Sequence, residues 1–106
     1  MLFDNDIIRF RNDRNWAQYH SPKNLAISIS IEAAELLELF QWRDGLPSDK
    51  RTAAAEEIAD VYIYLVTLAH DLNISIEGAV KDKLEKNGKK YPVDKSYGNA
   101  KKYNEL

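Results

Sequence analysis

Six carboxylates lie in two otherwise apolar stretches of this sequence, where a helical protein usually places apolar or neutral side chains. They are Glu32, Glu35, Glu38, Glu56, Glu57 and Asp60. An acidic side chain inside a packing segment costs free energy unless a cation or a hydrogen-bond donor meets it. The placement of these acids is therefore the strongest indication of chemistry in the chain.

Two pairs among these acids have the spacing that puts side chains on one face of a helix. Glu32 and Glu35 form the first pair, and Glu57 and Asp60 form the second. Residues three apart on a helix are neighbours, so each helix would present two carboxylates together. A short connection favours antiparallel packing of the two helices, which lets the four acids converge. Four negative charges in one place repel strongly without a counter-ion.

A hard divalent cation would relieve that repulsion. Mg²⁺ prefers carboxylate oxygens, and the set has no His or Cys donor, so Mg²⁺ is the predicted cofactor, with Mn²⁺ as a substitute. Four acids are enough for more than one ion. Glu38 is rotated further round its helix and Glu56 faces away from Glu57, which leaves each as a general base, a supporting group or a surface residue. The competing interpretation is a solvated acidic face, and the apolar residues around both pairs weaken it.

Aromatic side chains follow both acidic pairs at helical spacing, and cationic side chains recur in a later segment. Trp42 follows Glu35 by seven residues, about 10 Å further along a helix, and Tyr64 follows Asp60 by four. That separation suits a metal at phosphates and a ring at a base, although most such aromatics are core residues. Lys83, Asn87 and Lys90 would form a face suited to phosphate and sugar oxygens, or a plain polar surface.

The two histidines carry no such pattern. His20 and His70 are far apart in the sequence, and neither follows a Glu by three residues. We expect bundle or surface roles for both.

Helical periodicity and capping signals predict an all-α, four-helix bundle-type fold. Ser21 and Ser75 are the predicted N-caps of the second and fourth helices, and Pro22 is in the first turn of the second. The segment from Gly45 to Pro47 ends the second helix, and Pro92 lies beyond the fourth. The predicted helices span about 4–19, 22–43, 48–73 and 75–88. We expect one domain, 1–106, with 92–106 as a basic tail.

The composition excludes several classes of protein. The chain has 106 residues, a net charge of −2 and no Cys, which argues against bulk nucleic-acid binding, disulfides and zinc-thiolate sites. Residues 1–80 carry 7 basic and 13 acidic side chains, whereas residues 81–106 carry 8 Lys and 4 acids. No signal or membrane-spanning pattern is present, so we expect a cytoplasmic protein without a membrane or stable nucleic-acid partner.

The order and spacing of five motifs resemble those of the MazG-like, all-α nucleoside triphosphate pyrophosphohydrolases, in particular the subgroup similar to dCTP pyrophosphatase. The motifs are Arg14-Asn-Trp16, His20-x-Pro22-x-Asn24-Leu25, Glu32-Ala-Ala-Glu35-Leu-Leu-Glu38-Leu-Phe-Gln-Trp42, Glu56-Glu57-Ile-Ala-Asp60-Val-Tyr-Ile-Tyr64-Leu and Asn87-x-x-Lys90-Tyr91-Pro92. Ile31 stands where the family often has a further Glu beside Glu32.

The resemblance implies roles for individual residues. It makes Glu32, Glu35, Glu57 and Asp60 the Mg²⁺ ligands. It places Trp16 and Trp42 on either side of the base. It puts Tyr64 and Asn87 against the nucleotide and Lys90 near phosphate. The fold it implies is completed by homo-oligomerisation, as a dimer or a tetramer made from two dimers.

The expected activity is Mg²⁺-dependent hydrolysis of a nucleoside triphosphate to the monophosphate and pyrophosphate. The resemblance favours dCTP or a modified dCTP as substrate and nucleotide house-cleaning as the role. Glu35 or Glu38 is the expected general base, and helical spacing does not rank them. Two alternatives stay open: a carboxylate-bridged di-iron bundle, and a non-enzymatic helical dimerisation module with a solvated acidic face.

Overall fold

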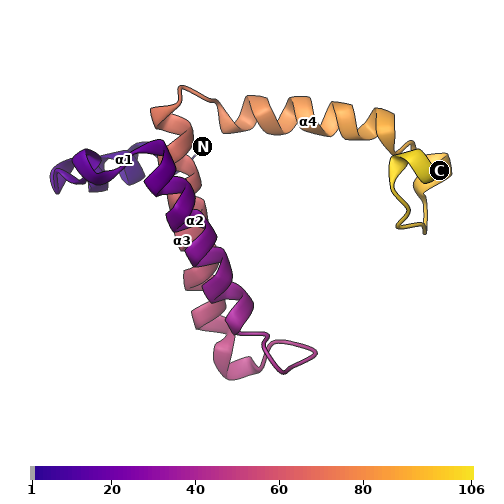
Figure 1. Cartoon of the computed structure of the whole chain (residues 1–106), viewed down its shortest axis with the longest axis horizontal. Coiled ribbons are helices and arrows are strands. Elements are labelled where there is room, and N and C mark those ends of the chain that lie inside the picture. Colours follow the sequence, from indigo (N-terminus) through magenta and orange to yellow (C-terminus); the bar gives the residue numbers. More distant parts are fainter. Residues whose placement is uncertain (1) are drawn as a thin grey trace. The chain divides into compact units, whose positions relative to one another are not determined.

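A computed structural model describes residues 2–106, and all regular elements in this range are helical (Figure 1). The chain divides into two compact units, and the boundary in the sequence lies between Ile74 and Ser75. The predicted all-α class is confirmed. No helix within the described range is long and apolar enough to cross a bilayer.

Two long helices form the centre of the first unit. Helix α2 (Pro22–Glu38) and helix α3 (Arg51–Asp71) lie side by side and antiparallel, as their short connection predicts (Figure 1). Leu25 is fully buried, and Ala54 and Val66 are also in the core. Helix α1 (Asp4–Asp13) contacts α3, and a 3₁₀ turn, η2 (Ser48–Lys50), leads into α3.

Both predicted serine caps are present. The hydroxyl of Ser21 accepts a hydrogen bond from the Asn24 backbone N–H at 3.1 Å, with Pro22 following in the first turn of α2. Ser75 accepts one from the Gly78 N–H at 3.1 Å. Each bond satisfies one of the donors that a helix leaves open at its N-terminus.

The first helix is shorter than predicted. It ends at Asp13 because Asn15 adopts a left-handed conformation, with φ of 53°, which a helix does not continue through. A separate 3₁₀ helix, η1 (Trp16–Tyr19), follows. Residues 4–19 are therefore two elements joined by a sharp bend.

The second helix also stops early, and the prediction that it runs to Trp42 and Arg43 is wrong. After Glu38 the N–H groups of Leu39 and Phe40 bond to carbonyls three residues back, so the winding tightens. Trp42 then has φ of 65°, in the left-handed region. The face that carries Glu35 ends before it reaches Trp42.

The second unit contains helix α4 (Ile76–Lys90) and a short helix, α5 (Val93–Ser96). A 3₁₀ turn, η3 (Tyr103–Glu105), follows near its end. Helix α4 extends two residues past the predicted end at Gly88 and stops before Pro92, as expected. The interpretation of 1–106 as one domain with a basic tail stays a prediction.

Candidate functional site

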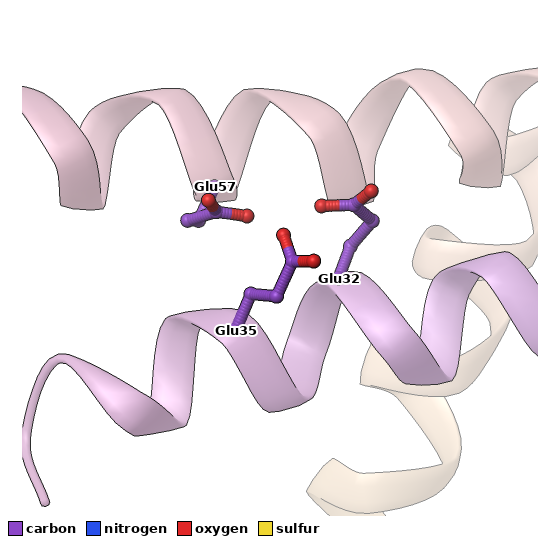
Figure 2. Close-up of side chains that lie close together, drawn as sticks. All are labelled: Glu32, Glu35 and Glu57. Atoms are coloured by element: carbon purple, nitrogen blue, oxygen red, sulfur yellow. The ribbon is translucent and has the colours of Figure 1, made fainter.

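Three of the six acids meet between α2 and α3. Glu32 and Glu35 extend from α2, Glu57 extends from α3, and each offers one carboxylate oxygen within 4.8 Å of the others (Figure 2). Figure 2 shows the three side chains converging on the space between the helices. The spacing of three residues on α2 and the antiparallel packing bring them together. This is the donor arrangement that a hard cation requires.

The cluster is electrostatically unsatisfied. Oε2 of Glu32 and Oε2 of Glu57 are buried and have no hydrogen-bond partner among the described residues. Burial, hydrogen bonding to Glu35 and Glu57, and the negative charges of Glu35 and Asp60 raise the pKa of Glu32 to about 7. Burial is also the main cause that raises the pKa of Glu57. Without a cation, this environment therefore favours the protonated forms of Glu32 and Glu57 more than water does.

The other three acids lie at different distances from this cluster. Asp60 is outside the group of three, but its charge acts on Glu32 and Glu57 and it lines the adjacent pocket. Glu38 is the exposed last residue of α2, and Glu56 is exposed on α3. Glu32, Glu35, Glu57 and Asp60 remain the predicted metal ligands.

A pocket of about 610 Å³ opens beside the cluster, within the first unit. Glu32 of the cluster and Asp60 line it, together with the aromatic residues Trp16 and Tyr64, which we call the aromatic wall. The remaining lining residues are Phe3, Asp6, Ile7, Phe10, Arg11, His20, Ala59, Tyr62, Ile63 and Thr67. A pocket lined by aromatic residues and adjoining a carboxylate cluster suits a ligand that combines a flat apolar group with a group that needs a cation.

Trp16 is held in this wall by α1. Its ring meets the Phe10 ring edge-on, with centroids 5.8 Å apart and an interplanar angle of 73°. The Arg14 guanidinium lies over Phe10, 3.6 Å from the ring centroid, and 5.9 Å from the centroid of Trp16. Edge contacts of this kind and cation–π contacts fix ring orientation.

Trp42 does not line this pocket. It lies beyond the end of α2 and is 93% exposed. The prediction that it shares the face of Glu35 is wrong, because that face depended on a helix that continues to residue 43. Its contact with a base stays a prediction.

The predicted contacts from the fourth helix lie in the second unit. Asn87 and Lys90 are both on α4, and the Lys90 ammonium is 4.8 Å from the ring centroid of Tyr103. Lys89, Lys90 and Lys95 border a pocket of about 370 Å³ in this unit. The roles of Asn87 with the nucleotide and Lys90 with phosphate stay predictions.

Three polar residues in or beside the pocket were not predicted. Arg11 is buried and forms a two-pronged ion pair with Asp71, and His20 lies within electrostatic range of both. Burial is the main cause that lowers the pKa of His20, with the Arg11 charge second. His20 lines the pocket, and its expected surface or bundle role stays a prediction. The motif His20-x-Pro22 is the sequence signal that marks His20 as a candidate site residue.

Known proteins resemble this chain in sequence. A model of the MazG-like family matches residues 27–106. The dCTP pyrophosphatase 1 proteins of Mus musculus and Homo sapiens are 40% and 39% identical to this chain over 104 residues. Each alignment covers 92% of this chain and 61% of the relative, so the chain spans about three fifths of the length of these proteins.

A solved structure extends the comparison to the fold. The crystal structure of a pyrophosphatase from Archaeoglobus fulgidus DSM 4304 superposes with a TM-score of 0.73 and 50% sequence identity. The match covers 83% of this chain and 87% of that one. The family predicted from the five motifs is confirmed: the chain belongs to the MazG-like family.

Proposed function

We propose that this chain is a Mg²⁺-dependent nucleoside triphosphate pyrophosphohydrolase, which cleaves between the α and β phosphates and releases a monophosphate and pyrophosphate. The observation that carries the proposal is the convergence of Glu32, Glu35 and Glu57 beside a pocket walled by Trp16 and Tyr64. One end of this site suits a cation with phosphates, and the other suits a base. Relatives that are named dCTP pyrophosphatase and pyrophosphatase support the reaction class.

The residues present fit a hard divalent cation. The donors are carboxylates, and two of their oxygens are buried with no partner in the described part of the chain. Burial, followed by interactions with the neighbouring acids, raises the pKa values of Glu32 and Glu57. Glu32, Glu35 and Glu57, with Asp60 beside them, would hold Mg²⁺, and Mn²⁺ meets the same requirements. When bound, Mg²⁺ supplies charge neutralisation for the phosphates and makes an attacking water more acidic.

A carboxylate of the chain would accept the proton of the attacking water. Glu35 lies within the cluster, whereas Glu38 lies one turn further on at the exposed end of α2. A general base must be within hydrogen-bond reach of the water, which favours Glu35 and leaves Glu38 as the second candidate.

The aromatic wall would hold the nucleoside and exclude water from it. Trp16 and Tyr64 line the pocket, and their aromatic rings are of the kind on which a base would stack. The name of the relatives favours dCTP as substrate. We extend the proposal to modified forms of dCTP and to house-cleaning of the nucleotide pool as the role. A second copy of the chain, in a dimer or in a tetramer of two dimers, would complete the site. Trp42, Asn87 and Lys90 are the further proposed contacts.

The test is product analysis with a panel of nucleoside triphosphates and Mg²⁺. We expect a monophosphate and pyrophosphate in equal amounts, dCTP or a 5-modified dCTP as the best substrate, and no turnover in excess EDTA. Glu57→Gln should lower turnover by about 100-fold or more, whereas Glu56→Gln, the same change at the adjacent exposed residue, should retain it. Release of diphosphate and orthophosphate, or no turnover of any nucleotide, would refute the proposal.

A further inference from the structure

Helix α1 buries a charge and leaves an aromatic ring half-exposed, the reverse of the usual pattern. Arg11 is the residue of α1 that is buried, with 7% of its surface exposed, whereas the neighbouring Phe10 is about half-exposed. The Arg11 guanidinium donates two hydrogen bonds to Asp71, from Nη1 to Oδ2 at 2.7 Å and from Nη2 to Oδ1 at 2.9 Å. The two residues are 60 positions apart, so the pair joins α1 to the far end of α3.

The geometry of this pair restricts the placement of α1 on α3. Asp71 is the last residue of α3, where the helix dipole disfavours an acid unless a cation meets it. The Arg11 hydrogen bonds are the main cause that lowers the pKa of Asp71. A two-pronged guanidinium–carboxylate contact fixes direction as well as distance, whereas an apolar contact tolerates sliding. A second polar link, from the Tyr62 hydroxyl to Asp4, is longer at 3.3 Å and lies at the other end of α1.

The aromatic wall of the pocket depends on this placement. Trp16 rests on Phe10, the residue before Arg11, and Arg14 covers the same ring. Trp16 belongs to η1, and the other end of η1 is linked to α2: Asn24 Nδ2 donates a hydrogen bond to the Tyr19 carbonyl at 3.2 Å. The segment between Arg11 and Asn24 is thus anchored to α3 on one side and to α2 on the other.

We infer that Arg11 and Asp71 are positioning residues for the nucleoside. Their ion pair sets the position of Trp16 relative to the pocket residues of α3, which include Tyr64. This inference rests on the proposed function for the identity of the ligand. The pair acts through Phe10 and Trp16, and the carboxylate cluster on α2 and α3 does not depend on it. Loss of the pair should therefore weaken nucleotide binding and leave the chemistry at the acids intact.

Kinetics of matched variants separate positioning from general stability. In Arg11→Met and in Asp71→Asn, Trp16 should occupy its wild-type position less often. If it does so about a tenth of the time, the KM for the best nucleotide rises about tenfold. We expect kcat and the Mg²⁺ concentration for half-maximal activity to stay within about twofold of wild type, because neither depends on the wall. Arg9→Met is the control, because Arg9 lies on the same helix in an exposed pair with Asp6, 4.0 Å apart.

A double variant gives a sharper comparison. Arg11→Met with Asp71→Leu removes both charges, and an apolar replacement of a buried ion pair is often neutral for stability. We expect its Tm to recover toward wild type while its KM stays raised. A double variant with wild-type Tm and wild-type KM would show that the pair does not position the wall.

Tryptophan fluorescence tests the inference without turnover. The sequence contains two tryptophans, so Trp42→Phe leaves Trp16 as the reporter. In that background, Asp71→Asn and the double variant should shift the emission of Trp16 to longer wavelength and increase its quenching by acrylamide. Arg9→Met should change neither, and far-UV circular dichroism should show helix retained in each variant. Unchanged emission and quenching in folded Asp71→Asn would overturn the inference. An absence of turnover in wild type would refute the proposed function and leave this comparison decisive.

Discussion

Glu32 and Glu57 face each other from α2 and α3, and each has one buried oxygen, Oε2, without a hydrogen-bond partner among residues 2–106. Burial of unpaired carboxylate oxygens is costly, so this relationship has no structural benefit to the chain by itself. Both groups have a raised pKa, mainly because burial disfavours the charged carboxylate. The pair is the part of the site where stability and proposed activity are in conflict.

The first prediction concerns removal of one charge from this pair. Glu57→Gln should lower pyrophosphate release by about 100-fold or more, the scale expected when a preorganised electrostatic group is lost. The same change should raise the Tm of the metal-free protein, because it removes repulsion with Glu32 and Glu35. Product assays and thermal denaturation in EDTA measure the two effects. Glu56→Gln should change neither, and a Glu57→Gln protein that loses stability as well as activity would contradict the prediction.

The second prediction is a pH dependence of the metal-free protein. The folded-state pKa of Glu32 is about 7, above its ordinary value of 4.5, so folding favours its protonated form. Its contribution to stability is therefore present below about pH 4.5 and is lost as the pH rises through about 7. Glu32→Gln should remove this loss and raise the Tm at pH 8 by roughly 5 °C.

The comparison must be between Glu32→Gln and wild type at each pH. His20 has a lowered pKa, so it contributes stability above its ordinary value of 6.5 and loses it as the pH falls, with the opposite sign. Differential scanning calorimetry in EDTA from pH 5 to pH 8 isolates the Glu32 effect. Mg²⁺ should raise the wild-type Tm most at pH 8, and equal Mg²⁺ stabilisation of both proteins would count against Glu32 as a ligand.

The third prediction concerns the acid side of the stability curve. Arg11 lowers the pKa of Asp71 below its ordinary value of 3.8, so the stabilisation from Asp71 is present above that value and is lost as the pH falls through the folded-state pKa. Asp71→Asn should reduce the free energy of unfolding at pH 7 by about 2 kcal/mol, between the values for exposed and fully buried pairs. Urea denaturation at pH 7 and pH 3 measures it. An equal deficit for Asp71→Asn at both pH values would contradict the assignment.

The sequence predicted the acids better than the aromatic wall. Glu32 and Glu35 meet Glu57 because a spacing of three residues and a short antiparallel connection are local properties, visible in the pattern. The position of Trp42 failed because it required four more residues of α-helix, and the chain tightens into 3₁₀ turns after Glu38. Helix ends depend on small differences in free energy that periodicity does not record.

The link between Arg11 and Asp71 was invisible in the sequence for a different reason. The two residues are separated by 60 positions, and neither belongs to a motif that names its partner. Side-chain hydropathy alone favours burial of Phe10 and exposure of Arg11, whereas half of the Phe10 surface is exposed and Arg11 is buried. The bend at Asn15 sets where the wall lies, and a left-handed residue of this kind has only a weak signal in a single sequence.

The last prediction is that the protein is a dimer or a larger assembly. Ile58, Leu65 and Leu72 are spaced by seven residues along α3 and its C-terminal end, and 57%, 42% and 47% of their surfaces are exposed. An apolar stripe with this spacing is suited to packing against another helix. Light scattering after size exclusion should give at least twice the mass of one chain, and Leu65→Lys should shift the protein toward the monomer. Leu2→Lys, the same change at an exposed leucine outside the stripe, is the control and should keep the assembly. A wild-type monomer at micromolar concentration would contradict this prediction.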